Sequence, residues 1–105
     1  MKLTSPNYPK WYFSNGKDCH WLLTAPEGNI IALEFNYFQG STLLMFDGIC
    51  DQTRELKTVF GKMPHNEKWI ISSSGRHMFV DFVIDIQNSN PGFSASIHFG
   101  NKDRL

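Results

Sequence analysis

Two cysteines and four histidines are the side chains of this 105-residue sequence that bind metal ions most readily. Cys19 and His20 are adjacent, but neighbouring residues of a strand point to opposite faces, so the two are poorly placed to share an ion. The other histidines, His65, His77 and His98, lack the close spacings of a zinc site. We therefore expect the histidines to lie on strand faces or at the surface, and we predict neither a metal site nor a cofactor.

Hydrolysis is the second chemistry to consider, and it needs a serine, a histidine and an acid that converge. The serines at 72–74 lie near His77 and Asp81 in the sequence, but such residues are abundant on the surface of any β protein. The sequence contains neither a nucleophile elbow nor a glycine-rich phosphate loop. A hydrolytic enzyme is therefore the least favoured function, and we predict no catalytic residues.

The two cysteines are not expected to bridge each other. Cys19 begins an apolar run, after which the chain reverses at 26–28 and again at 39–40. Cys50 then lies beyond the far end of a strand that runs in the same direction as the first. Such strands span ~17–20 Å, whereas bridged Cα atoms lie within ~7 Å. Cys19 is interpreted as a small buried side chain or the partner of an upstream cysteine, and Cys50 as an inert thiol or one that joins another chain.

The composition describes one domain without a dominant charge. Hydrophobic residues make up 41% and charged residues 19%, which are globular values. Ten basic and ten acidic residues give zero formal net charge, so attraction to nucleic acid or anionic membranes is not encoded. The sequence lacks a run of the ~20 apolar residues that cross a bilayer, and residues 1–4 do not resemble a signal peptide. We expect a single domain over 1–105, with no nucleic-acid partner and no direct membrane insertion.

The elements that would position these residues are short strands, because apolar residues alternate through most of the chain. Strands are expected over 19–24, 30–38, 42–46, 56–60, 69–73, 77–86 and 93–99, with a break at 39–41. One face of the second strand should carry Ile31, Leu33, Phe35 and Tyr37, and one face of the sixth Met78, Val80, Phe82 and Ile84. This pattern predicts an all-β fold, a jelly-roll-like β-sandwich of two antiparallel sheets.

Six ordered pieces of the sequence form a wider pattern. They occupy residues 19–23, 31–38, 46–48, 73–75, 78–85 and 92–95, after a Ser-Pro-Asn-Tyr-Pro opening at 5–9. Together they resemble the CUB domain, a β-sandwich module of extracellular proteins, over roughly residues 3 to 99. The resemblance implies a domain that binds proteins or glycans and is not an enzyme. It also implies an excerpt of a larger secreted or cell-surface protein.

The cysteines depart from the family pattern. CUB domains commonly carry four cysteines, paired first to second and third to fourth. Cys19 occupies the second position, and the other three positions hold other residues or precede the sequence. Cys50 follows the Asp47–Gly48 turn, where the family has no standard cysteine.

The calcium positions depart as well. Many CUB domains bind calcium through a Glu and an Asp of the loop after the 31–38 strand and a late Asp, supported by a Tyr. Tyr12 and Asp85 match the last two positions, but the loop is reduced to 39–41 and contains neither acid. Glu34 lies too far back on the preceding strand to replace them. Because Ca²⁺ takes about six to eight oxygen ligands, we predict that Tyr12 and Asp85 are vestigial positions and that binding is calcium-independent.

Two aromatic segments are the candidate binding residues. Trp11 and Tyr12 belong to an opening aromatic cluster, although such aromatics usually pack over the sandwich end. His65, Lys68 and Trp69 belong to a polar loop, and loops at sandwich ends commonly carry recognition. Exposed aromatic side chains favour protein or sugar contacts.

These observations together favour a non-catalytic extracellular recognition module that contacts a protein partner, whose identity is unknown, through its end loops. The alternative is a glycan-binding, lectin-like module. It would be favoured if Trp11 or Trp69 were flat, exposed and flanked by polar groups.

Overall fold

The computed structural model describes residues 1–5, 19–64, 66–83 and 92–101. Within these ranges the chain forms seven strands, and every pairing between them is antiparallel. The strands are β1 (Lys2–Thr4), β2 (Cys19–Thr24), β3 (Ile30–Asp47), β4 (Arg54–Lys62), β5 (Ile70–Ser72), β6 (His77–Val83) and β7 (Gly92–Gly100). The described ranges include no helix of the length and apolarity that a bilayer crossing requires. The expected all-β fold is confirmed.

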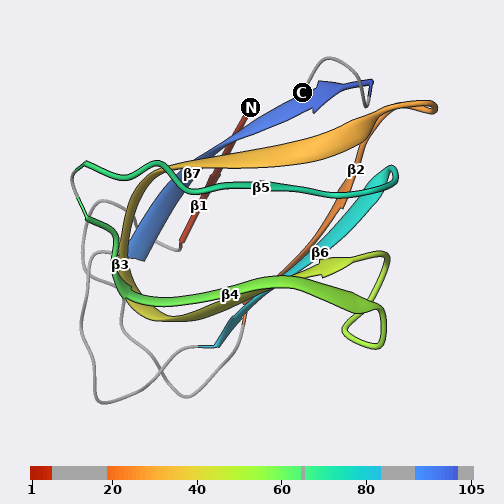
Figure 1. The fold of residues 1–105 in the computed structure, drawn as a ribbon. Helices are drawn as coiled ribbons and strands as arrows, with labels where there is room; N and C mark the ends of the chain where they lie inside the picture. The colour runs from red at the N-terminus through yellow and green to blue at the C-terminus, as the bar shows by residue number, and fades with distance from the viewer. Residues whose placement is uncertain (6–18, 65, 84–91, 102–105) are drawn as a thin grey trace.

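One long strand, β3, belongs to both layers of the fold (Figure 1). Its first half pairs with β7 on one side and β5 on the other, and its second half pairs with β6 and β4. β1 extends the first layer beside β7, and β2 extends the second beside β6. The seven strands thus form one continuous antiparallel sheet that curls into two layers, β1-β7-β3-β5 and β4-β3-β6-β2, called the first and second sheets below. This two-layer arrangement confirms the predicted sandwich.

The predicted break at 39–41 is wrong, because β3 continues through these residues. Gln39 lies opposite Lys62 and Gly40 opposite Gly61, and the register then shifts before Thr42. An irregularity of this kind bends and twists a strand without ending its pairing. The chain therefore passes from one sheet to the other with its backbone still hydrogen-bonded, and Figure 1 shows the curl that results.

The directions of the strands agree with those expected for the cysteines. β2 and the second half of β3 both pair antiparallel with β6, so they run the same way. Cys19 lies opposite Phe82, which lies opposite Leu43 near the start of that half. Cys50 comes after Asp47, which lies ~13 Å of extended strand beyond Leu43. This geometry supports the expectation that the two cysteines do not bridge, which stays a prediction.

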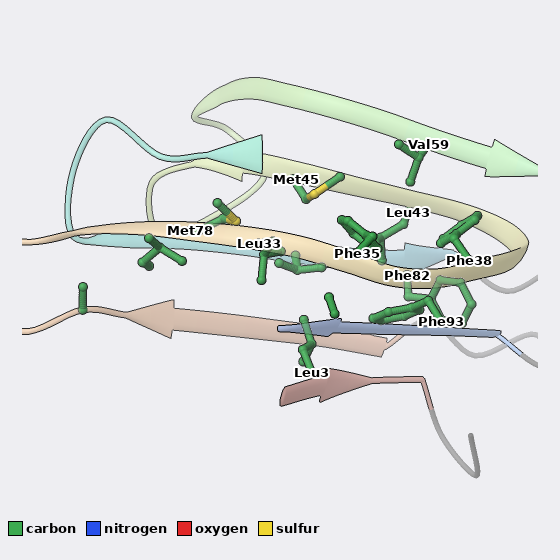
Figure 2. Packing of buried hydrophobic residues seen from close by; sticks show 14 residues of the cluster. Leu3, Leu33, Phe35, Phe38, Leu43, Met45, Val59, Met78, Phe82 and Phe93 are labelled. Atoms are coloured by element: carbon green, nitrogen blue, oxygen red, sulfur yellow. The ribbon is translucent and has the colours of Figure 1, made fainter. Parts of the chain in front are cut away.

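The core lies between the two sheets and consists of alternate residues of the strands (Figure 2). Its largest completely buried side chains include Phe38, Phe82, Phe93, Ile31, Leu33, Leu43, Met45, Met78 and Val80. The ring centroid of Phe93 lies 5.2 Å from Phe82, 5.8 Å from Trp21 and 6.2 Å from both Phe35 and Phe38. The inward positions predicted at 31, 33, 35, 78, 80 and 82 are confirmed, and Ile84 lies outside the described residues.

Tyr37 does not take the inward position predicted for it. The register shifts between Phe35 and Tyr37, so Phe38 becomes the buried residue and is only 1% exposed. Tyr37 is half-buried, and its hydroxyl donates to Oε1 of Gln39 at 2.7 Å. One extra residue in the strand moves the side chains that follow it to the other face. The second shift, between Gly40 and Thr42, restores the original phase, so Leu43 and Met45 are buried again.

Strand ends also differ from those expected. Alternation does not predict β1, because three residues are too few to show it, yet β1 pairs with β7 and buries Leu3. β4 is longer than the predicted 56–60 and β5 shorter than the predicted 69–73.

Candidate recognition surface

Glu34, Lys68 and His98 form a charged cluster on the outer face of the first sheet. Glu34 lies on β3, between Ile70 of β5 and Ser96 of β7. Its Oε2 lies 3.2 Å from Nζ of Lys68, and its Oε1 lies 3.2 Å from Nε2 of His98. The hydrogen bond from Lys68, followed by that from His98, lowers the pKa of the Glu34 carboxyl. Lys68 is 76% exposed, so this predicted binding residue is at the surface but has an acidic partner.

Trp69 is half-buried and belongs partly to the core. Its ring centroid lies 6.3 Å from that of Phe35 and 5.8 Å from that of Phe38. Its carbonyl oxygen accepts a hydrogen bond from the backbone N–H of Phe35 at 2.9 Å, and its indole N–H donates to Oε2 of Glu67 at 3.3 Å. Trp69 is therefore not the flat, exposed platform that a sugar-stacking role requires.

An open pocket lies beside Trp69, on the side of the sandwich formed by β4 and β5. It has a volume of about 210 Å³ and is lined by Trp69 and four consecutive residues of β4, Lys57, Thr58, Val59 and Phe60. Val59 is buried, whereas Phe60 is 73% exposed. The pocket therefore joins the edge of the core to an exposed aromatic ring.

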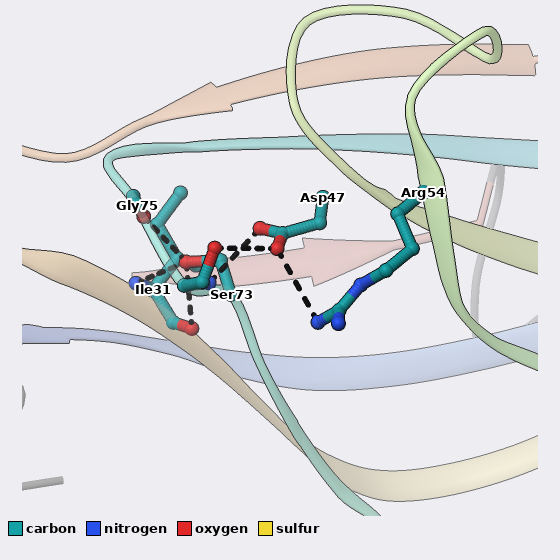
Figure 3. A network of polar contacts seen from close by, with 6 residues as sticks. Ile31, Asp47, Arg54, Ser73 and Gly75 are labelled. Carbon is teal, nitrogen blue, oxygen red and sulfur yellow. Dashed lines mark hydrogen bonds and ion pairs between the residues drawn. The ribbon is translucent and has the colours of Figure 1, made fainter.

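Two of the serines considered for hydrolysis, Ser73 and Ser74, bind the backbone and a neighbouring carboxylate (Figure 3). Ser73 is buried, its Oγ accepts from the N–H of Ile31 at 2.9 Å, and it donates to the carbonyl of Gly75 at 2.6 Å. Ser74 donates to Asp47 through both its backbone N–H, at 2.9 Å, and its hydroxyl, at 2.5 Å. These contacts fasten the turn between β5 and β6 to β3.

The histidine and acid that would complete a triad have other partners. Nδ1 of His77 lies 3.1 Å from Oγ1 of Thr24, and Oδ1 of Asp81 lies 3.2 Å from Nδ1 of His20. The structure does not bring these groups to the serines.

Four of the predicted site residues, Trp11, Tyr12, His65 and Asp85, lie outside the described residues. Their assignments, including the vestigial calcium positions, stay predictions. The loop that would carry the acidic calcium ligands is absent at 39–41, because β3 continues through these residues. The carboxylate of Glu34 contacts Lys68 and His98. In the ranges that the structure describes, no three His, Cys, Asp or Glu side chains are grouped to hold a metal ion.

Sequence reasoning missed Lys57 and Phe60. Phe60 follows Val59 directly, and consecutive residues of a strand point to opposite faces, so one of the pair had to face outward. Two consecutive bulky apolar residues in one strand, Val59 and Phe60, were therefore the signal in the sequence that one apolar side chain is exposed.

Comparisons with known proteins give a consistent result. The family model for the CUB domain matches residues 1–97. Human procollagen C-endopeptidase enhancer 1 is 33% identical over 103 residues, covering 90% of this chain and 22% of that protein. Human cubilin is 35% identical over 101 residues, covering 89% of this chain and 3% of that protein. The chain thus spans less than a quarter of the length of either relative.

Solved structures show the same fold. The CUB1-EGF-CUB2 domain of human MASP-1/3 superimposes with a TM-score of 0.83 at 22% identity, covering 98% of this chain and 42% of that one. The extracellular region of zebrafish Gpr126/Adgrg6 superimposes with a TM-score of 0.79 at 24% identity, covering 96% of this chain and 14% of that one.

Proposed function

Because this chain belongs to the CUB domain family, we propose that it is a non-catalytic module that binds a protein partner outside the cell through its end loops, without calcium. CUB domains occur in extracellular proteins, where they are protein-interaction modules and generally not catalytic.

Calcium independence is supported by one observation, the continuity of β3. An acidic loop at 39–41 would have to leave the strand between Phe38 and Thr42, yet Gln39 and Gly40 pair directly with β4. The nearest acid on β3, Glu34, is held by Lys68 and His98 on the first sheet. A calcium site with so few carboxylates has little affinity.

The loop between β4 and β5 supports recognition by the end loops. Lys68 projects from this loop with 76% of its side chain exposed, and Glu34 orients its ammonium group. A positioned, solvent-exposed cation is suited to an acidic group on a protein partner. Trp69 anchors the loop to the core through Phe35 and Phe38.

Calorimetric titration of the purified chain with calcium chloride tests the first part of the proposal. We expect no saturable heat, and the same unfolding temperature in millimolar calcium as in chelator, because a ligand that binds the folded state would raise it. Micromolar calcium binding would contradict the proposal.

Screening the immobilised chain against secreted proteins and ectodomains, with a glycan array and a generic ester assay in parallel, tests the second part. We expect a protein ligand whose binding weakens in Lys68→Ala. Lys2→Ala is the matched control, because Lys2 is an exposed lysine at the opposite edge of the first sheet. Binding to glycans alone would favour the glycan-binding alternative, and ester hydrolysis would favour an enzyme. Wild-type affinity in Lys68→Ala would show that the loop between β4 and β5 does not contact the partner.

A further inference from the structure

β4 is an edge strand in the part of the chain that the structure describes. Among the described residues it pairs with β3 alone. With nine residues it is longer than the other edge strands, β1, β2 and β5. An edge strand presents unpaired N–H and C=O groups, to which a further strand can add.

The regular part of β4 coincides with the pocket beside Trp69. Lys57 to Phe60 pair with Met45 to Thr42 in unbroken register, and the register shifts on either side of them. These four residues line the pocket. A strand that adds here would therefore lie along straight, evenly spaced hydrogen-bonding groups and directly over the pocket.

The pocket suits one bulky apolar side chain. Three of the residues that line it, Trp69, Val59 and Phe60, are apolar. A cavity of ~150 Å³ holds a benzene-sized group, so about 210 Å³ accommodates a leucine or phenylalanine side chain. Covering Phe60 would also remove the most exposed aromatic ring of the described residues from water.

Two lysines of β4 lack an acidic partner among the described residues. Between Arg54 and Ile70 the sequence has four basic and two acidic residues. Arg54 lies 3.6 Å from Asp47 and Lys68 pairs with Glu34, whereas Lys57 and Lys62 have no ion pair with any described residue. Lys57 lines the pocket and Lys62 ends the strand, so acidic residues of a bound segment would find partners on this edge.

The same lysines disfavour a second copy of this chain as the occupant. If two β4 strands paired antiparallel and centred between Val59 and Phe60, Lys57 of each would lie opposite Lys62 of the other. Like charges directly opposite each other destabilise a strand pair. Lysine on an edge strand is a usual means of preventing self-association.

We propose that β4 binds an extended protein segment that adds to the second sheet as a strand, inserts one bulky apolar side chain beside Trp69, and carries acidic residues that pair with Lys57 and Lys62. The site uses the edge of β4 and the adjoining Trp69 but not the Lys68 ammonium group, so it goes beyond the recognition proposed above.

Selection of peptides from a random twelve-residue phage library on the immobilised full chain tests the proposal. We expect selected peptides to alternate apolar and polar residues, with a central Leu, Ile, Phe or Tyr and flanking Asp or Glu. On the doubly substituted chain Lys57→Glu and Lys62→Glu, the acidic flanks should be replaced by basic ones. The absence of any selected peptide, or selection of peptides without this pattern, would overturn the proposal.

Substitutions then locate the binding. Phe60→Ala should weaken a selected peptide about tenfold or more, as truncation of an aromatic anchor does. Leu22→Ala, an exposed apolar residue on the opposite edge strand β2, is the matched control and should not change the affinity. Both side chains are exposed, so neither change is expected to prevent folding.

Amide hydrogen exchange separates strand addition from other modes of binding. Bound peptide should slow hydrogen exchange at the outward-facing amides of residues 57–60. Unchanged exchange at these amides would contradict strand addition. Sedimentation that showed a dimer dissociated by Phe60→Ala would instead assign this edge to a second copy. Lys68→Ala should leave peptide binding intact, so this site and the end-loop proposal can fail independently.

Discussion

Glu34 shows how a single carboxylate can hold two segments of the first sheet. It lies on β3, and its two oxygens contact Lys68, from the loop before β5, and His98, from β7. The pKa of its carboxyl is lowered, chiefly by the hydrogen bond from Lys68 and then by that from His98. A carboxyl group with a lowered pKa in the folded state stabilises that state only while it is ionised.

The pH dependence of folding should therefore change when Glu34 is neutralised. In the wild-type chain this contribution is complete above the unfolded-state pKa of the carboxyl and is lost as the pH falls through the lower folded-state pKa. We expect Glu34→Gln to be less stable than wild type at neutral pH, and the difference to shrink as the pH falls below the ordinary carboxyl value of 4.5. Urea unfolding midpoints at a series of pH values measure this.

Glu27→Gln is the matched control for that experiment, because Glu27 is an exposed turn residue without an ion pair to any described residue. A constant difference between Glu34→Gln and wild type across the acid range would show that Glu34 acts by packing and not by charge.

At the scale of the elements, the turn after β3 depends on a close contact of Gly48. A Cβ atom at position 48 would collide with Cγ2 of Thr53. Two hydrogen bonds to the carbonyl of Cys50 hold Thr53 in place. Its hydroxyl donates at 2.6 Å and its backbone N–H at 3.2 Å, so the side chain cannot easily move away from an added Cβ atom.

Gly48→Ala should therefore destabilise the fold by about 1–3 kcal/mol, the usual cost of overpacking. Gly75→Ala is the matched control, since a Cβ atom there meets nothing within 4 Å. Equal unfolding midpoints for the two variants in urea would contradict this account of the turn.

The strands were predictable from alternation, but the irregularities within them were not. Met78, Val80 and Phe82 face inward as expected, because a regular strand keeps its period of two. Tyr37 and Phe38 exchange places because of a register shift that depends on the partner strand β7. The same limit applies at 39–41, where a polar Gln-Gly-Ser sequence resembles a turn but pairs with β4.

The candidate site was predictable in part for the same reason. Loop position and residue type indicated Lys68 and Trp69 as binding residues. Lys68 is exposed on the loop between β4 and β5, and Trp69 lines the pocket beside β4. Whether Trp69 is exposed depends on its contacts with Phe35 and Phe38, which are distant in the sequence. Likewise, the pocket exists only because β4 and β5, from different sheets, lie on the same side of β3.

At the scale of the whole molecule, the two sheets depend on Phe93. This residue of β7 is completely buried and contacts rings from β2, β3 and β6. Phe93→Ala should cost about 3–5 kcal/mol, because it leaves a cavity among several aromatic rings. Since domains of this size are stable by only ~5–15 kcal/mol, the variant should be marginally folded.

Phe93→Leu provides a second measurement if the alanine variant does not fold. It should lower the free energy of unfolding by a smaller amount. Phe60→Ala, which removes an exposed ring, should change the free energy of unfolding by less than about 0.5 kcal/mol. Equal losses at positions 60 and 93 would contradict the distinction between a binding ring and a core ring.

Since β3 belongs to both layers, a hydrogen-bonded backbone runs from one layer into the other, in addition to the side chains packed between them. A mechanical load on the first layer would pass directly along β3 into the second. The layers of a domain under tension would therefore separate only after ladders on both flanks of the shared strand had ruptured.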